Sequence, residues 1–451
     1  MIQAQPKEDY KHSFQDSVRL VLENTRATEA MAVATAFNNA WAGMGPDQQF
    51  LIRKQAALMK KKGYKVRPHL VNYYGAIASA LTIENTDQAK FAKYLSVAGK
   101  VIEKEPVTQA NLFFQNSRDF FEHHALHFTK AFTLRAQDDE YDFEYFEAIA
   151  DTTTYAYQEP DTTAYNRPMW QQPIVQPEVA GARIRFLTLT LNFITPFDSA
   201  FLKNTSGIFS LRNKLFVGEG GRLDWSTAGV AADSVYYDLN KYHFNTAQPS
   251  LRAEQGKLTH LGRLARSVPG VMEFKSINHK TKTSSSYPRF KSYESNINIL
   301  GLGSDKIKYT GGFGMLGRAI NSNSMDMMPA TVEVFGDSNK KFKAISSSFG
   351  FKDSLIVSAK AKVTIYQQND SIVHPAMQLE YEYNNQQLVL TKEGSQLRKA
   401  PFTSSFFDVD FFCRPPLLEH EIRHDHHVYN GQQQSGSHDH RVGGFLRSQW
   451  I

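Results

Sequence analysis

Apolar residues recur at helical spacing through the first part of the chain. Phe14, Val18 and Leu22 lie four residues apart, which places their side chains on one face of a helix. Gly63 follows three lysines, an arrangement that predicts a helix end. The pattern predicts helices within residues 14–22, 28–41, 47–62, 66–81, 86–105 and 108–128. Their succession at a period of about 40 residues predicts an antiparallel helical array over residues 8–126, either a bundle or a short α-solenoid.

Beyond His127 the apolar period changes from helical to two. Residues 127–150 contain two alternating runs on either side of Asp138 and Asp139, which predicts a β-hairpin extension with these aspartates at its turn. Residues 151–178 are rich in Pro, Thr, Gln and Tyr, and this composition is typical of a linker.

Alternation continues through residues 179–412, which predicts a β-rich region. The run RIRFLTLTLNFITPF places Leu187, Leu189, Leu191 and Phe193 on one face of a half-buried strand. Similar runs recur, and several pair across an Asn, Asp or Gly turn. The predicted fold class is therefore α+β: a helical array followed by a mostly antiparallel β region, built as sandwich modules or as a β-solenoid.

Composition and charge indicate an ordinary globular protein. Of the 451 residues, 41% are hydrophobic and 21% are charged, which is enough for two or three domains. Basic and acidic residues, 51 and 45, are close to balance at a formal charge of +6, and this argues against a nucleic-acid partner. Since no run of about 18 apolar residues occurs, we expect no membrane-spanning helix in this chain.

Cysteine usage and the first residues bear on the compartment. The chain has one cysteine, Cys413, so it can form no internal disulfide and no Cys-based zinc site. A nearly thiol-free chain is compatible with an oxidising compartment. The start MIQAQPKEDYKHSF lacks a signal peptide, but QAQP resembles what remains after one is cleaved. We expect a periplasmic or cell-surface location with the secretion signal lost upstream; the cytoplasm is the alternative.

The most specific motif is a possible zinc-peptidase sequence near the end of the chain. His420, Glu421 and His424 have the H-E-x-x-H spacing, in which a helix brings both histidines to one metal and the glutamate activates water. A third ligand is required, but His427 and Asn430 stand where the metzincin pattern has Gly and His. The polar, glycine-broken flank also suits a catalytic helix poorly. A zinc metallopeptidase is therefore the last of the candidate functions.

The composition of residues 413–451 differs from everything before it. Six of the 15 histidines lie between positions 420 and 440. A histidine codon read one base later encodes only Ile, Met or Thr, which favour strands. We therefore expect an irregular or frameshifted tail here, and a chain that is a fragment of a larger protein.

Two further motifs have weaker support. His123 and His127 lie four apart on a predicted helix beside Glu122 and His124, which is a metal-ligand spacing without an evident further ligand. Residues 312–317 match G-x-G-x-x-G, but the segment that follows is short, polar and ended by Pro329, so a glycine-lined turn is expected there. No cofactor is expected.

Three stretches carry a resemblance to known proteins: FFEHHALHFTKAFTLRAQDDEYDFEY, FLKNTSGIFSLRNKLFVGEGGRLDW and SSYPRFKSYESNINI. They resemble segments of very large, uncharacterised exported bacterial proteins that begin with helices and continue as long β-rich regions. The resemblance implies a cell-envelope location and supplies no catalytic residue. The function expected is thus a non-enzymatic envelope scaffold or binding protein whose partners are other envelope proteins or polysaccharide. A carbohydrate-active β-solenoid enzyme is the alternative.

Overall fold

The computed structural model describes residues 13–137, 140–147, 175–337, 339–391, 401–405, 409–411 and 418–421. It divides into two compact units, which are considered separately. The first unit is drawn from Met1–Thr227, Tyr236–Gly256 and Glu273–Lys280, and the second from Ala228–Val235, Lys257–Met272 and Thr281–Ile451.

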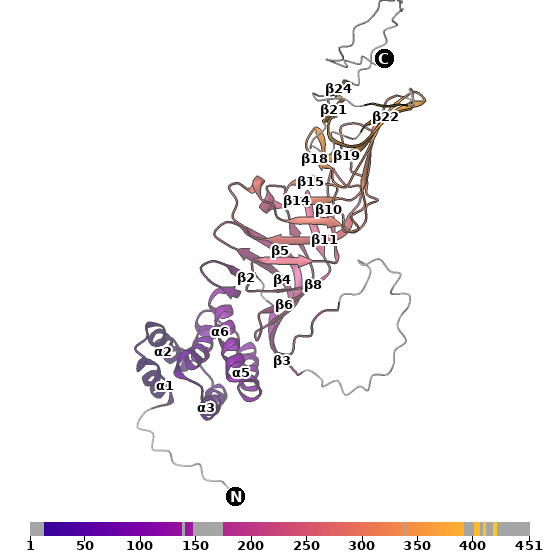
Figure 1. Ribbon diagram of the computed structural model, residues 1–451. Coiled ribbons are helices and arrows are strands. Elements are labelled where there is room, and N and C mark those ends of the chain that lie inside the picture. Colours follow the sequence, from indigo (N-terminus) through magenta and orange to yellow (C-terminus); the bar gives the residue numbers. More distant parts are fainter. Residues whose placement is uncertain are drawn as a thin grey trace, which may run out of the picture. The chain divides into compact units, whose positions relative to one another are not determined.

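Six α-helices open the first unit, as predicted (Figure 1). They are α1 (Phe14–Glu23), α2 (Thr28–Trp41), α3 (Pro46–Lys61), α4 (Val71–Thr82), α5 (Gln88–Lys104) and α6 (Val107–His123), with a π-helical turn, η1 (Val66–Leu70), before α4. Local chemistry sets their ends. The side chains of Ser13 and Asp87 accept hydrogen bonds from the first turns of α1 and α5, and Gly63 follows α3 with a φ of 74°.

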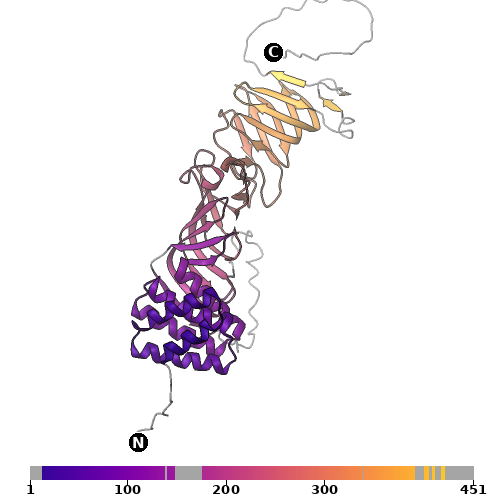
Figure 2. The ribbon, with the colours of Figure 1, turned by 90° about the vertical axis from the view of Figure 1, so that its left-hand side faces the viewer.

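The helices stack as antiparallel pairs, which favours the solenoid form of the predicted array (Figure 2). Helices α2, α4 and α6 pack in succession, and α3 packs on α5. Hydrogen bonds between α3 and α5 join residues 40 apart: the side-chain amide of Gln55 donates to the carbonyl of Leu95 (2.7 Å), and Lys62 donates to that of Ile102 (2.7 Å). The period inferred from sequence is therefore a physical repeat.

Helix α6 ends five residues earlier than predicted. His124 adopts the left-handed conformation, with a φ of 49°, and its N–H bonds to the carbonyl of Phe120 (2.8 Å). This turn ends the helix, and β1 begins at Ala125. His123 and His127 are consequently on different elements, and the prediction that they share one helix is wrong.

The strands follow in sequence order, with short 3-10 turns η4 (Ser226–Ala228) and η5 (Lys282–Ser284) between them. Their bounds are β1 (Ala125–Phe128), β2 (Thr133–Gln137), β3 (Tyr141–Phe146), β4 (Gly181–Ile194), β5 (Ser199–Ser210), β6 (Leu215–Asp224), β7 (Val235–Leu239), β8 (Lys241–Asn245), β9 (Ser250–Ala253), β10 (Gly256–His260), β11 (Val268–Lys275), β12 (Arg289–Ser292), β13 (Ile307–Thr310), β14 (Gly314–Leu316), β15 (Ala319–Asn321), β16 (Ala330–Phe335), β17 (Lys340–Ser346), β18 (Gly350–Phe351), β19 (Leu355–Gln367), β20 (Asp370–Glu382), β21 (Gln387–Thr391), β22 (Phe402–Ser404), β23 (Val409–Phe411) and β24 (Leu418–Glu421). The helical start and the antiparallel β region confirm the α+β class.

Strand β4 has two neighbours placed end to end along one edge. Its residues 181–186 pair with β3, and its residues 190–194 pair with β2. The predicted hairpin of residues 127–150 is therefore wrong, because β2 pairs with β4 and with β1 instead of with β3. A strand of 14 residues is long enough to hold both short strands in this way.

A β-bulge divides β4 between these two neighbours. The register with β5 shifts between Phe186 and Leu189, so the buried positions change phase. Phe186 is buried on one side of the shift and Leu189, Leu191 and Phe193 on the other, whereas Leu187 is 64% exposed. The predicted apolar face is thus confirmed for three of its residues and wrong for Leu187.

Strand β6 bends at the same level. Thr205 of β5 pairs with Gly220, and Gly220 and Gly221 have φ values of 71° and 102°. A Cβ on Gly221 would lie 3.2 Å from the carbonyl oxygen of Lys203. Before the bend, residues 215–219 of β6 pair with β8. After the bend, residues 222–224 pair with β7. The sheet is therefore folded into two halves, and aromatic side chains pack between them. The rings of Phe193 and Phe244 are one such pair, with centroids 5.6 Å apart.

The helices of this unit share a core with its first strands. The ring of Phe143 on β3 lies 5.1 Å from Tyr94 on α5, 5.5 Å from Phe121 and 6.2 Å from Phe120 on α6. The helical array is thus continuous in packing with the sheet, which differs from the predicted boundary at residue 126. Most of the predicted linker at residues 151–178 lies outside the described residues.

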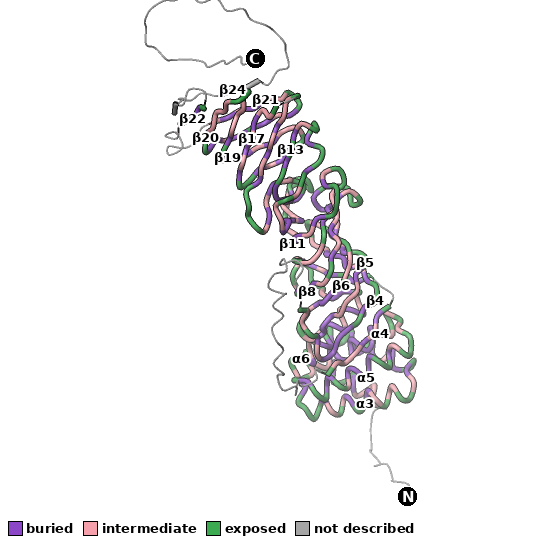
Figure 3. Tube along the Cα trace, turned by 90° about the vertical axis from the view of Figure 1, so that its right-hand side faces the viewer, coloured by how far each residue is buried: buried purple, intermediate pink, exposed green. Residues whose placement is uncertain are grey.

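The second unit repeats the bent-strand arrangement. The 13-residue strands β19 and β20 pair along their length with register shifts between Ser358 and Val363. One half of β19 pairs with β18 and the other with β17. Buried and partly buried positions alternate along most of β17, as Figure 3 shows. None of the described helices in either unit is both long and apolar enough to cross a membrane.

Candidate functional site

The zinc-peptidase motif does not lie on a helix where the structure describes it. His420 and Glu421 belong to β24, and their Cα partners are Leu388 and Gln387 of β21. A zinc peptidase needs both histidines one helical turn apart, and a strand separates positions four apart by about 13 Å. His424 lies outside the described residues. The predicted irregular tail therefore contains a paired strand at Leu418–Glu421.

The glycine motif at residues 312–317 forms a turn, as expected. Leu316 pairs with Ala319 across a tight connection between β14 and β15, and Gly317 has a φ of 55°. A Cβ on Gly317 would collide with the carbonyl oxygen of Ser285. Because β15 follows the last glycine directly, this segment lacks the helix that a dinucleotide site requires.

The remaining metal candidates are dispersed. Among the described residues no three His, Cys, Asp or Glu side chains are grouped as a metal site would need. His127 lies on β1, where its Nδ1 is 3.4 Å from Lys214 Nζ, and burial, with a contribution from this lysine, lowers its pKa. Near the predicted turn at Asp138 and Asp139, the Asp142 side chain pairs with Lys93 at 2.7 Å. Asp138 and Asp139 themselves lie outside the described residues.

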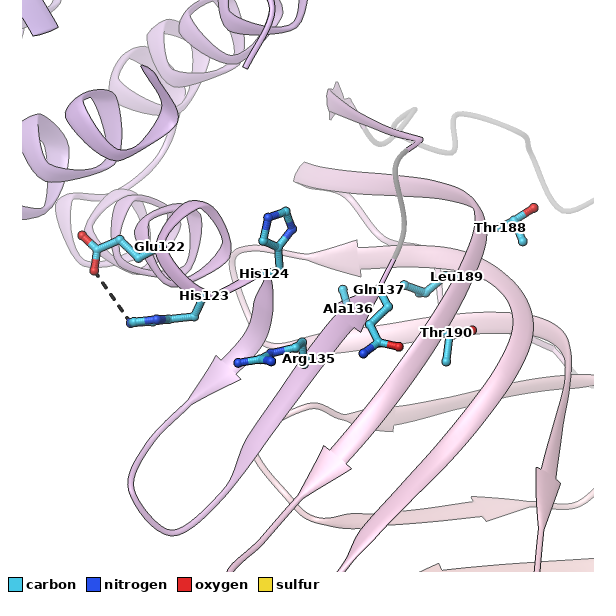
Figure 4. Close-up of a pocket in the computed structure, with 9 residues that line it drawn as sticks. All are labelled: Glu122, His123, His124, Arg135, Ala136, Gln137, Thr188, Leu189 and Thr190. Carbon is cyan, nitrogen blue, oxygen red and sulfur yellow. Dashed lines mark ion pairs between the residues drawn. The ribbon is translucent and has the colours of Figure 1, made fainter. Parts of the chain in front are cut away.

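An open pocket of about 770 Å³ lies in the first unit (Figure 4). Its wall is the end of α6, its floor is β2, and its far side is the bend of β4. The lining residues are Glu122, His123, His124, Arg135, Ala136, Gln137, Thr188, Leu189 and Thr190. Of these residues, the sequence singled out only the two histidines and Glu122, as a metal-ligand spacing without an evident further ligand.

The pocket lies where the β ladder is interrupted. Gln137 is the last residue of β2 and pairs with Thr190, whereas β3 resumes the pairing at Phe186. Neither these strands nor β5 supplies a ladder partner to Leu187 or Thr188. The bulge of β4 therefore lies beside the pocket, which Thr188, Leu189 and Thr190 line.

A buried carboxylate positions one of the two histidines. The Glu84 side chain, which is 9% exposed, has Oε2 2.7 Å from His124 Nε2. Its Oε1 accepts a hydrogen bond of 2.8 Å from the Tyr141 hydroxyl. Burial, and then the Glu84 carboxylate, raise the pKa of Tyr141 well above its ordinary value, so this hydroxyl remains a donor. The His124 side chain is 48% exposed, so part of its ring faces the pocket.

Two side chains donate hydrogen bonds to Glu122, the carboxylate in the pocket wall. Glu122 Oε1 accepts hydrogen bonds from Arg118 Nε (2.6 Å) and Ser79 Oγ (2.9 Å). Its other oxygen lies 3.9 Å from His123 Nε2, the pair that Figure 4 marks. The His123 ring stacks on Phe128 at 3.7 Å, and Phe128 is 43% exposed. An aromatic surface therefore adjoins the polar wall.

The floor and far side are polar and have no partners within the described part of the chain. Arg135 and Gln137 are on the face of β2 opposite the buried Ala136. No hydrogen bond or ion pair joins the side chains of Arg135, Gln137, Thr188 or Thr190 to another described residue. A guanidinium, an amide and two hydroxyls thus line one open pocket with their hydrogen-bonding capacity unused, a combination that suits a polar ligand.

No family model, curated protein or solved structure matches this chain. The chemistry of the pocket is therefore the basis for a functional assignment.

Proposed function

We propose that this protein is a non-enzymatic binding protein of the cell envelope, and that the pocket between α6, β2 and β4 binds a saccharide. The observation that carries the proposal is that Arg135, Gln137, Thr188 and Thr190 line one pocket, and that none of them has a partner among the described residues. A saccharide presents many hydroxyls that both donate and accept, and these side chains match that chemistry. The exposed ring of Phe128 beside His123 suits the apolar face of a sugar.

Binding is favoured over glycoside hydrolysis by the engagement of the carboxylates. Hydrolysis uses two carboxylates on opposite sides of the bond. Glu122 accepts from Arg118 and Ser79, and Glu84 is directed toward His124 and Tyr141. Neither of these two carboxylates faces solvent across from a second acid, as hydrolysis would require. A carbohydrate-active enzyme is therefore the second candidate.

The envelope location rests on the sequence. A chain of 451 residues with one cysteine suits an oxidising compartment, and the resemblance to exported bacterial proteins points to the same place. Fractionation of the source cells tests this part: recovery of the protein with the cytoplasmic fraction would contradict it.

The binding claim is tested by titrating the full chain with oligosaccharides of envelope polymers in a calorimeter. Thr190→Val removes one hydroxyl at constant shape, and we expect it to weaken binding by about tenfold, the effect of one lost hydrogen bond to a ligand. Thr364→Val, on β19 of the second unit, is the matched control and should leave affinity unchanged. Equal affinities of the two variants would show that the binding site lies elsewhere in the chain. Release of new reducing ends from the oligosaccharide would favour the carbohydrate-active enzyme.

A further inference from the structure

We infer that the saccharide bound in this pocket carries an anionic substituent, a carboxylate or a phosphate, and that Arg135 binds it. This inference rests on the proposed function and adds the ligand class. It follows from the charges around the pocket and from the way β2 holds Arg135.

The carboxylates that the structure describes near the pocket already have partners other than Arg135. Glu122 is paired with Arg118, which also pairs with Glu29 at 2.6 Å. Glu84 faces His124 at 2.7 Å. Arg135, by contrast, has no ion-pair partner among the described residues, so it is the lining residue that brings an uncompensated permanent charge.

The carboxylates of β3, the strand that follows β2, are compensated as well. Asp142 pairs with Lys93 at 2.7 Å. Glu144 lies 3.0 Å from Arg183 and 2.9 Å from Arg185. These acids therefore do not supply a partner for Arg135, and an anion brought by a ligand would.

The backbone under Arg135 is held on both edges. Arg135 pairs with Asn192 of β4 on one side and with Ala125 of β1 on the other. A guanidinium on such a floor offers a planar pair of donors that matches a carboxylate or phosphate. Gln137, two residues along the same face, and Thr190, its cross-strand partner, then reach the hydroxyls of the same sugar.

A sugar acid or sugar phosphate fits the site better than a small free anion. The pocket volume of about 770 Å³ exceeds the size of a single phosphate, and most of its polar lining is uncharged. A simple anion would leave Gln137, Thr188 and Thr190 without partners. The charge is thus one element of a larger recognition surface.

The test compares charged and neutral probes on the full chain by calorimetry. Trigalacturonate is the carboxylate probe and its methyl ester the neutral counterpart, while glucose 6-phosphate and glucose form the phosphate pair. We expect at least one acidic probe to bind about tenfold or more tightly than its neutral partner, with an affinity that falls as NaCl is raised. The acidic pair that shows this preference identifies the source of the anion.

Substitutions assign the preference to a residue. Arg135→Gln should abolish the acidic preference, and Arg135→Lys should restore part of it. Arg318→Gln, an exposed arginine in the turn between β14 and β15, is the control. Because Arg135 is exposed, both variants should unfold at the temperature of the parent protein.

Four outcomes would overturn the inference. Equal binding of acidic and neutral probes, or an acidic preference that survives Arg135→Gln, contradicts the role of charge while leaving the proposed function standing. Binding of inorganic phosphate as tight as that of glucose 6-phosphate shows a small-anion site. Absence of binding by every saccharide contradicts the proposed function as well.

Discussion

Phe143 is the residue through which the helices and the sheet of the first unit stabilise each other. Its ring is 6% exposed and lies within 6.2 Å of the rings of Tyr94, Phe120 and Phe121. Phe143→Ala removes most of that buried ring, and we expect it to lower the free energy of unfolding by about 3–5 kcal/mol. Phe50→Ala is the control, because Phe50 on α3 is 69% exposed and its loss should cost less than about 0.5 kcal/mol.

Hydrogen exchange followed by mass spectrometry distinguishes a shared core from separable domains. In a shared core, Phe143→Ala lowers the protection of α5 and α6 by the same free energy as that of β4 and β5. Urea unfolding of the variant gives the total loss. Normal protection of α5 and α6 in a variant whose strands exchange rapidly would refute the shared core and support the boundary predicted from sequence.

Three further predictions concern stability. Burial raises the pKa of Asp119 from 3.8 to about 6 against the opposing effect of Lys214, so the folded protein holds this proton more tightly and loses stability as pH rises from about 4 to 6. Asp119→Asn should remove that loss and raise the free energy of unfolding at pH 7.5 by about 1–2 kcal/mol, after allowance for partial exposure, as measured by urea titrations at pH 4 and pH 7.5. Leu187→Ala should cost less than about 0.5 kcal/mol and Leu191→Ala about 2–5 kcal/mol by the same method, and similar costs would contradict the bulge in β4. Gly221→Ala should cost about 1–3 kcal/mol because of its φ of 102°, and an unchanged melting temperature would argue against the bend in β6.

The helices and the fold class could be predicted because their signals are local. Apolar spacing and the end signal at Gly63 act within a few residues, and the structure follows them. The pairing of β2 and β3 with β4 joins residues at least 35 apart in the chain (Phe146 and Gly181), so the local turn signal at Asp138 and Asp139 led to the wrong neighbour.

The pocket could not be predicted for a related reason. It depends on a bulge that leaves Leu187 and Thr188 without ladder partners, and strict alternation in the sequence hides such a bulge. His123 and His124 suggested chemistry at the right place, but the left-handed turn at His124 separated His127 from them. The residues that make the site polar, Arg135 and Gln137, carry no motif at all.

The most direct measurement of the central claim is photo-crosslinking of the full chain with trigalacturonate that carries a diazirine at its reducing end, followed by peptide mapping. The account predicts labelled residues within 122–137 and 187–190, with labelling suppressed by unmodified trigalacturonate and reduced by Arg135→Gln. Specific, competable labelling confined to other parts of the chain would contradict it.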